Sequence, residues 1–453
     1  SMKAMGIDIG TTTICGIVMD AQTGKVLSVQ TLKNDAPVKG EAYEWLQDPA
    51  RILELVQKMY REFLSEYSDI CSIGLTGQMH GIVYTNAQGE AVSPLYTWQD
   101  ERGNEQAPNG RKYVENLMEL TGYPMATGFG ITTHYVLEQT GQVPADAAHF
   151  CTIYDYIGMK LTGRTSPLIT ASGGASLGCF DLEKLEFDQE AMKKAGIDCS
   201  LLPECAKGFA LIGKTPEGIP VGAGIGDNQA SVLGSVKDAS GSVLINVGTG
   251  SQVSAGVDHY LKAEHVELRP LAGDAYILAG SSLCGGRAYA ALEKFLRQTV
   301  AAMTGEEPDS LYGKMAEVLE KRGTAPGTLT VNTRFRGTRE NPSLTGGISN
   351  LVLENFNPEE LIFGVLSGIA EELTTFYKSM REQGAAKPRY LVGSGNGIRM
   401  NPYLRRIFED IFGLKMQIPS HNEEAAFGTA LFAMTAAGVY PTITDAQKLI
   451  RYI

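Results

Sequence analysis

The feature that most constrains the fold is a short pattern that occurs twice in the chain. Residues 7–13 read Ile-Asp-Ile-Gly-Thr-Thr-Thr, and residues 245–251 read Ile-Asn-Val-Gly-Thr-Gly-Ser. The shared glycines, Gly10 and Gly248, lie 238 residues apart in a chain of 453 residues, and a second apolar strand follows each copy. Solenoid repeats are much shorter, about 20 to 50 residues. The spacing therefore predicts two similar α/β domains that face each other across a cleft.

Both copies predict a hairpin loop that binds phosphate. A tight turn of glycine and threonine exposes backbone N–H groups together with hydroxyls, and both groups suit phosphate oxygens. One copy alone would be interpreted as an ordinary hairpin, but a second copy half a chain away favours phosphate binding. The residues assigned to this role are Gly10, Thr11, Thr12 and Thr13 in the first loop and Gly248, Thr249 and Gly250 in the second.

The boundary between the two domains is predicted near residues 234–242, where Ser, Gly, Lys and Asp replace the apolar runs. We therefore assign residues 1–238 to the first domain and residues 239–453 to the second. Within them, apolar residues at helical spacing predict a helix over residues 48–67. Asn357 and Pro358, followed by two acids, predict the start of another helix that runs to about residue 383.

A carboxylate in the loop at residues 225–231 is the candidate catalytic residue. Gly226 permits a sharp turn after a short apolar strand, and this turn would present Asp227 at the strand end. Ligands bind at such strand ends in α/β sheets. The alternative is an aspartate that only caps the helix that follows. The residues by themselves leave both interpretations open.

Two groups of polar side chains suggest a site for a polyol. Gln78, Met79 and His80 lie between two glycines at the end of a predicted strand, and amide and imidazole groups can bind hydroxyls. A histidine with a purely structural role is the alternative. Trp98 stands beside Asp100, and an aromatic face flanked by polar groups suits a stacked sugar ring, whereas a buried packing tryptophan is the alternative.

A glycine-rich stretch near the end of the second domain suggests a place for a flat ring. Residues 393–397 read Gly-Ser-Gly-Asn-Gly and follow a predicted strand at residues 389–392. Bare backbone there would let adenine lie close to the chain, although a simple glycine-rich connection is the alternative. The nucleotide-binding candidates here are Gly393, Ser394, Gly395, Asn396 and Asn401, the last of which also precedes a predicted helix.

A match to the P-loop pattern is rejected. Residues 208–215 satisfy G-x-x-x-x-G-K-[ST], but prolines at 203, 216 and 220 surround them. A true P-loop follows a strand and opens a helix, and proline-rich flanks allow neither.

Composition limits the classes of partner. The net charge is −12 and no run of Lys and Arg occurs, which argues against nucleic acid and favours a small-molecule substrate. No apolar run of about 18 residues, the length needed to span a membrane, occurs in the chain. The first residues lack the basic and then apolar pattern of a secretory signal. The seven cysteines are scattered without a CxxC pair. We expect a cytoplasmic protein without a membrane partner and with unpaired thiols, and we allow for a homodimer.

With these motifs assembled, the chain resembles the FGGY carbohydrate kinases, which belong to the sugar kinase, Hsp70 and actin superfamily. The resemblance covers nearly the whole chain and implies an α/β fold of two actin-like, ribonuclease H-like domains. It also implies ATP-dependent phosphorylation of a sugar hydroxyl, with Asp227 as the base and Asp8 placing Mg²⁺. Six motifs occur in the family order, at residues 6–12, 77–81, 98–100, 226–229, 248–251 and 393–397.

Within that family the motifs resemble those of ketose kinases, and those for sedoheptulose more than those for xylulose. Gln99 is a departure from the xylulose kinases, which more often carry Asn at this position. The resemblance implies that Gln78, His80, Asp100 and Asn228 bind the ketose. A non-catalytic nucleotide-binding module of the actin or Hsp70 kind is the alternative from a different class, and it would leave these polyol-binding residues without a purpose.

Overall fold

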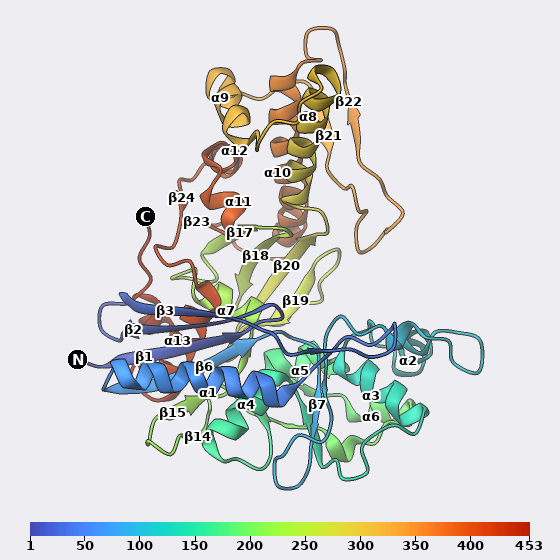
Figure 1. Cartoon of the computed structure of the whole chain (residues 1–453), viewed down its shortest axis with the longest axis vertical. Helices are drawn as coiled ribbons and strands as arrows, with labels where there is room; N and C mark the ends of the chain where they lie inside the picture. The colour runs from blue at the N-terminus through green and yellow to red at the C-terminus, as the bar shows by residue number, and fades with distance from the viewer. The chain divides into compact units, whose positions relative to one another are not determined.

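The computed structural model describes all 453 residues, which form two compact units (Figure 1). The N-terminal unit contains Ser1–Lys237, Arg269–Tyr276 and Glu423–Arg451, and the remaining residues form the C-terminal unit. The first segment ends one residue before the end predicted for the first domain. The two later segments differ from the prediction, because they return the chain to the N-terminal unit from within residues 239–453.

A seven-stranded sheet forms the centre of the N-terminal unit. Its order is β14-β15-β6-β1-β2-β3, and β16 also pairs with β6. Strand β1 is antiparallel to β2 and parallel to β6, and both neighbours are largely buried because helices cover both faces. The strands are β1 (Lys3–Ile9), β2 (Thr13–Asp20), β3 (Val26–Lys33), β6 (Ile70–Gly77), β14 (Leu211–Lys214), β15 (Pro220–Gly222) and β16 (Ile225–Gly226).

One face of this sheet is covered by α13 (Glu424–Ala436), a helix of small residues from the end of the chain. Two strand glycines permit its close approach. A Cβ atom at Gly6 would lie 2.0 Å from the carbonyl oxygen of Ala426, and one at Gly74 would lie 2.0 Å from that of Thr429. Any larger residue at either glycine would push the helix away from the sheet.

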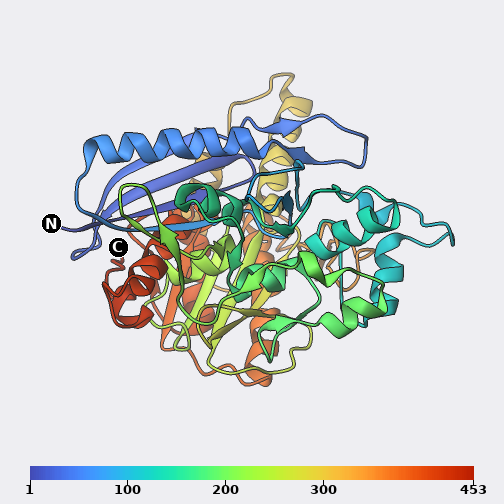
Figure 2. The ribbon, with the colours of Figure 1, turned by 90° about the horizontal axis from the view of Figure 1, so that it is seen from below.

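The opposite face is covered by α1 (Pro49–Glu66), which confirms the helix predicted over residues 48–67. A Cβ atom at Gly16 would lie 2.3 Å from the sulfur of Met59 in this helix. Gly16 pairs with Ile7, the residue after Gly6. Because successive side chains in a strand point to opposite faces, Gly16 and Gly6 face opposite sides of the sheet, and so do the helices that they contact. Figures 1 and 2 show α1 and α13 on the two sides of these strands.

A second apolar cluster of the N-terminal unit includes Tyr84, Ile131 and Phe150. The other helices of the unit are α2 (Tyr113–Thr121), α3 (Gly130–Gln139), α4 (Ile153–Thr162), α5 (Ala171–Leu177), α6 (Gln189–Lys194), α7 (Asp227–Leu233) and α14 (Ile443–Gln447). Its short strands are β4 (Pro37–Val38), β5 (Leu46–Gln47), β7 (Val83–Thr85), β8 (Leu95–Tyr96), β9 (His149–Cys151), β10 (Leu168–Ile169), β11 (Phe180–Asp181), β12 (Glu186–Phe187) and β13 (Glu204–Cys205).

The C-terminal unit repeats the same strand pattern. Strand β17 is antiparallel to β18 and parallel to β23, as β1 is to β2 and β6. The six-stranded sheet has the order β19-β20-β18-β17-β23-β24. Its strands are β17 (Ser242–Val247), β18 (Ser251–Val257), β19 (Glu267–Pro270), β20 (Tyr276–Ser282), β23 (Tyr390–Ser394) and β24 (Met416–Gln417). Both copies of the repeated motif therefore form the hairpin that the sequence predicts.

Helices pack on this second sheet, and a two-stranded sheet of β21 (Thr330–Asn332) and β22 (Gly347–Ser349) lies beside α10. The helices are α8 (Arg287–Thr304), α9 (Tyr312–Arg322), α10 (Pro358–Glu382), α11 (Asn396–Arg399) and α12 (Pro402–Phe412). The predicted start of α10 is confirmed, because Asn357 Oδ1 accepts from the Glu360 amide at 2.9 Å. None of the helices is long and apolar enough to cross a membrane.

The rejection of the P-loop is confirmed. Residues 211–214 of the matching stretch form strand β14, and the chain continues from Thr215 into a turn and strand β15 without a helix.

Candidate active site

Three neighbouring strand ends bring the two predicted acidic residues to one edge of the N-terminal sheet. Strand β6 lies between β1 and β16, and its last residue, Gly77, is paired with Ile9 on one side and Gly226 on the other. Asp8 immediately precedes Ile9, and Asp227 immediately follows Gly226. The register of the sheet therefore places both carboxyl groups at the same edge.

One carboxyl oxygen of Asp8 lacks a protein partner. Its Oδ1 atom is buried and makes no hydrogen bond. Burial raises the pKa of Asp8 to about 7, and the negative charge of Asp227 contributes further. A buried, unpartnered carboxylate oxygen beside a second carboxylate attracts a proton or a cation.

Asp227 begins α7 but does not cap it. Gly226 occupies the N-cap position, so the interpretation of Asp227 as a helix cap is wrong. Burial raises the pKa of Asp227 to about 6. A hydrogen bond from the backbone N–H of Asn228 and the positive charge of Arg269 lower this pKa and so limit the rise. The carboxylate is therefore largely deprotonated at neutral pH and can accept a proton, as a general base must.

Arg269 is a site residue that sequence reasoning missed. It belongs to the short segment Arg269–Tyr276, which returns to the N-terminal unit. Its Nη1 atom donates to Asn228 Oδ1 at 2.7 Å. This contact orients the side-chain amide of Asn228 and leaves its N–H donors available to a ligand.

The first phosphate-type loop has its carbonyl groups bound to protein. Asn34 donates from Nδ2 to the Gly10 oxygen at 2.9 Å and from its backbone amide to the Thr12 oxygen at 2.9 Å. Gln47 Nε2 donates to the Thr11 oxygen at 3.1 Å. The loop is left with hydroxyls and N–H groups to present, which is the polarity that a phosphate requires.

Gln78 is joined to this loop through Gln47. Its Nε2 atom donates to Gln47 Oε1 at 3.0 Å, and Asn34 Nδ2 donates to the same oxygen at 3.1 Å. Gln78 Oε1 is buried and has no partner. Sequence reasoning missed Asn34 and Gln47, because isolated amides carry no motif, yet their network fixes the predicted sugar ligand relative to the loop.

Met79 and His80 follow in a constrained turn. Met79 fills the space beside Gly226, where a Cβ atom would lie 2.8 Å from its sulfur. His80 has a φ of 76°, its Nδ1 lies 2.8 Å from the Ser176 oxygen, and its ring stacks on Phe129 at 4.7 Å. A carbonyl oxygen only accepts, so Nδ1 carries the hydrogen. The ring is thus oriented from two sides, and its role toward a substrate stays a prediction.

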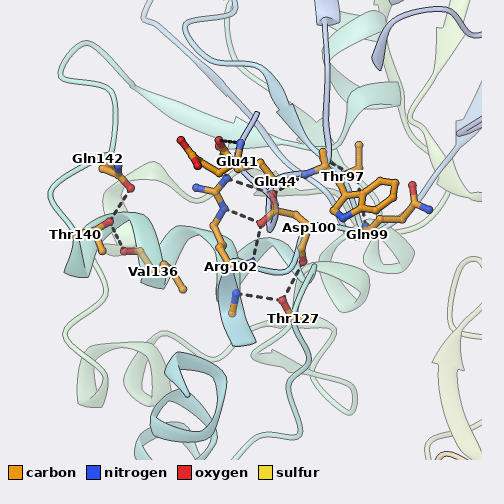
Figure 3. Close-up of polar contacts among 12 residues, drawn as sticks. Glu41, Glu44, Thr97, Gln99, Asp100, Arg102, Thr127, Val136, Thr140 and Gln142 are labelled. Atoms are coloured by element: carbon orange, nitrogen blue, oxygen red, sulfur yellow. Dashed lines mark hydrogen bonds and ion pairs between the residues drawn. The ribbon is translucent and has the colours of Figure 1, made fainter. Parts of the chain in front are cut away.

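Asp100 is surrounded by protein donors (Figure 3). It is fully buried, and Arg102 contacts both carboxylate oxygens, from Nε at 2.7 Å and from Nη2 at 3.2 Å. The Trp45 amide adds a third contact at 3.1 Å, and Arg102 Nη2 also reaches Glu44 at 2.9 Å. This arrangement makes Asp100 an anchor for its loop, and its direct contact with a sugar stays a prediction.

Trp98 lies at the surface next to the phosphate-type loop. It is 45% exposed, so the alternative of a buried packing tryptophan is wrong. Its indole Nε1 donates to Thr11 Oγ1 at 2.9 Å. Gly128, with a φ of 86°, packs against the Trp98 carbonyl and leaves no room there for a side chain. The aromatic face is accessible to a ligand.

A further acid, Asp155 of α4, lies next to Gly224, just before the strand β16 that leads to Asp227. Thr152 Oγ1 contacts its Oδ2 atom at 2.6 Å, whereas Oδ1 is buried without a partner. A Cβ atom at Gly224 would lie 3.2 Å from Oδ1. Burial raises the pKa of Asp155 to about 8, so this carboxyl is protonated at neutral pH.

In the C-terminal unit, the second phosphate-type loop borders a cavity of about 390 Å³. The loop is closed by a hydrogen bond from the Gly248 amide to the Gly250 oxygen at 2.8 Å. Thr249 and Ser251 contribute to the lining. Asn246 Nδ2 donates to Ser394 Oγ at 2.9 Å, which ties this loop to the glycine-rich stretch at residues 393–397.

A more apolar cavity of about 510 Å³ lies beside that glycine-rich stretch. Gly286 and Gly397 contribute bare backbone to its walls, and Tyr289 contributes an aromatic ring. Asn396 and Asn401 also line it, and Asn401 Oδ1 caps α12 by accepting from two amides. A mostly apolar space with a few amide groups suits a purine base.

Another cavity, of about 800 Å³, lies elsewhere in the N-terminal unit. His149, Lys184 and Glu204 contribute to its lining, and none of the predicted site residues does. No group of three or more His, Cys, Asp and Glu side chains forms a ready metal site. The unpartnered Asp8 oxygen beside Asp227 nevertheless fits a cation that completes its coordination with water and phosphate oxygens.

Comparisons with known proteins agree with this arrangement. The N-terminal domain of the FGGY family of carbohydrate kinases matches residues 3–243, and the C-terminal domain of that family matches residues 243–437. A sedoheptulokinase from Mus musculus is 26% identical over 94% of this chain and 96% of its own length. A glycerol kinase from Alteromonas mediterranea is 25% identical over 97% of this chain and 92% of its own length.

Solved structures share the fold. The ligand-bound xylulose kinase from Lactobacillus acidophilus has a TM-score of 0.83 and 20% identity, and the similarity covers 100% of this chain and 93% of that one. The expected two-domain α/β fold of the sugar kinases is therefore confirmed.

Proposed function

Since the chain belongs to the FGGY family of carbohydrate kinases and is an ATP-dependent sugar kinase, we propose that its acceptor is a ketose phosphorylated at a terminal primary hydroxyl. Sedoheptulose, giving sedoheptulose 7-phosphate, is the first candidate. The similarity to the Mus musculus sedoheptulokinase supports this choice, as does the resemblance of residues 97–100 and 227–229 to the motifs of that class. Xylulose is the second candidate, supported by the structural likeness to a xylulose kinase.

The observation that carries the proposed mechanism is the position of Asp227 at a strand end beside Asp8 and Asn228. Asp227 accepts the proton of the attacking hydroxyl as its oxygen forms a bond to the γ-phosphorus. The bond between that phosphorus and the bridging oxygen to the β-phosphate breaks, and ADP leaves with the electron pair. Phosphoryl transfer depends mainly on positioning and charge, which these side chains supply.

The sugar is assigned to side chains of the N-terminal unit. Gln78 Oε1 is an unused, buried acceptor, and the Asn228 amide offers donors, so the two can bind neighbouring hydroxyls. Trp98 offers an exposed ring for the apolar face of the sugar. Asp100 supports this region by holding its loop through Arg102.

The nucleotide is assigned to the second loop and the apolar cavity of the C-terminal unit. Hydroxyls and N–H groups at residues 248–251 suit its phosphates, and the cavity beside Asn396 and Asn401 suits its base. Residues 10–13 of the N-terminal unit stay predicted phosphate ligands. Asp8 would hold Mg²⁺, which offsets phosphate charge when bound. A non-catalytic module of the actin or Hsp70 kind is not supported, because both matched domains are those of carbohydrate kinases. A homodimer and a cytoplasmic location stay predictions.

The test is a coupled measurement of ADP release with sedoheptulose, xylulose, ribulose, fructose and glycerol as acceptors. We expect the highest kcat/KM with sedoheptulose, and a preference for glycerol would contradict the ketose proposal. Asp227→Asn should lower kcat by about 10³-fold, within the range for loss of a general base, while calorimetry still detects sugar binding. Substantial turnover by this variant would show that another group takes the proton.

A further inference from the structure

Neither phosphate-type loop contains a cation. Residues 10–13 and 248–251 carry only glycine, threonine and serine. The chain as a whole has a net charge of −12, and a nucleotide adds several more negative charges. Hydroxyls and N–H groups orient phosphates but do not neutralise them. Positive charge from another part of the chain is therefore needed in addition to any metal.

Arg339 is the only charged residue that lines the 390 Å³ cavity at the second loop. The other lining residues are amides, serines, threonine and glycines, among them Thr249, Ser251 and Ser282. A guanidinium group in such a hydroxyl-rich cavity has the donor geometry for two phosphate oxygens at once.

Arg339 belongs to an arginine-rich segment between β21 and β22, which also contains Arg334 and Arg336. Arg334 is committed to protein, since its side chain is 18% exposed and pairs with Glu371 at 3.2 Å and Glu372 at 3.5 Å. This double ion pair fixes the start of the segment to α10. Arg334 therefore anchors the segment rather than binding a ligand.

The tip of the segment has a defined turn around Arg339. Gly337 has a φ of 72°, which a side chain rarely tolerates, and its amide donates to the Arg334 oxygen at 3.1 Å. Beyond it, Thr338 and Asn341 exchange two hydrogen bonds, of 3.1 Å and 3.0 Å. The turn that bears Arg339 is thus ordered before any ligand binds, which lowers the entropic cost of binding.

The present partner of Arg339 is replaceable. Its Nη1 atom contacts Glu267 Oε1 at 2.6 Å, but the two side chains are 57% and 47% exposed. An ion pair in contact with water contributes little to stability, because solvent screens it. Phosphate oxygens in the adjoining cavity would offer the guanidinium a stronger, bidentate contact.

We propose that Arg339 exchanges Glu267 for the phosphate groups of the bound nucleotide and is the residue that supplies positive charge at the second loop. This inference rests on the proposed function and extends it by assigning a nucleotide-binding residue outside the six motifs. Glu267 then acts as a competitor that holds Arg339 in place while the nucleotide is absent.

Calorimetry with ADP and with adenosine tests the exchange. Arg339→Gln should weaken ADP binding by about 10-fold or more and leave adenosine binding unchanged, because adenosine has no phosphates. Arg339→Lys should recover part of the loss. Glu267→Gln should bind ADP at least as tightly as the unmodified chain. Arg389→Gln, which removes another exposed, ion-paired arginine of the C-terminal unit, is the matched control and should change neither.

The outcomes separate this inference from the proposed function. Equal ADP binding by Arg339→Gln and the unmodified chain would overturn the exchange. A parallel loss in Arg339→Gln and Glu267→Gln would also overturn it, since the ion pair would then have only a structural role. If ADP binding follows the expected pattern but no ketose stimulates ADP release, the proposed acceptor fails and the assignment of Arg339 stands.

Discussion

Replacing Asp155 with asparagine should stabilise the protein, and more so as the pH rises. Burial raises the pKa of this carboxyl from 3.8 to about 8, so the folded chain keeps it protonated at a pH where the unfolded chain ionises it. A group with a raised folded pKa contributes most below its unfolded pKa, and that contribution is lost as pH rises toward the folded value. The relevant window is therefore about pH 4 to 8.

The size of the effect follows from the shift. In this window, each pH unit lowers the free energy of unfolding by about 1.4 kcal/mol. Between pH 5 and pH 7, Asp155 alone therefore lowers it by about 3 kcal/mol. Asparagine keeps the shape and an acceptor for the Thr152 hydroxyl but cannot ionise. The gain in unfolding free energy for Asp155→Asn should therefore be about 3 kcal/mol larger at pH 7 than at pH 5.

Urea unfolding followed by tryptophan fluorescence measures this difference where it arises, because both tryptophans of the chain, Trp45 and Trp98, lie in the N-terminal unit. Asp188→Asn is the matched control. Hydrogen bonds from the Ala191 amide and the Tyr123 hydroxyl lower the pKa of Asp188. The variant should therefore be less stable than the unmodified chain at neutral pH, and this difference in unfolding free energy should shrink as the pH falls. Parallel pH profiles for Asp155→Asn and the unmodified chain would refute the reasoning.

Three further predictions follow from the site and the sheet. The kcat/KM for the sugar should rise with pH through about 6 as Asp227 loses its proton, and a pH-independent rate between 5 and 7 would contradict the role of this carboxyl as base. Arg269→Gln should move that rise to higher pH, because the arginine charge lowers the pKa of Asp227, and the pH profile of turnover checks this. Gly74→Ala should destabilise the N-terminal unit by about 3 kcal/mol in urea, since its Cβ would lie 2.0 Å from the Thr429 oxygen. Gly347→Ala, whose Cβ meets nothing within 4 Å, should be nearly neutral.

Much of the fold could be predicted because local patterns determine it. The repeated motif at Gly10 and Gly248 predicted two equivalent hairpins, and both occur in matching sheets. The cap at Asn357 predicted α10 from four residues of sequence. These features depend on backbone conformation and helix ends, which neighbouring residues specify.

The long-range contacts of the site could not be predicted. Arg269 reaches Asn228 from a segment about 40 residues later, and Gln47 joins Gln78 to the first loop from a separate small sheet. Asp100 was assigned to the sugar, yet Arg102 and the Trp45 amide occupy both its oxygens. Motifs identify the residue types at a site, but only tertiary packing decides which oxygens remain available to a ligand.

The late return of the chain to its first sheet has a consequence for synthesis on the ribosome. Strands β1 and β6 are complete by residue 77, but the helix that covers one of their faces begins at residue 424. At about 5 to 20 residues per second, the nascent sheet waits tens of seconds with that apolar face uncovered. Nascent chains stalled before residue 424 should therefore bind chaperones and stay unfolded, whereas chains extended past residue 436 should fold.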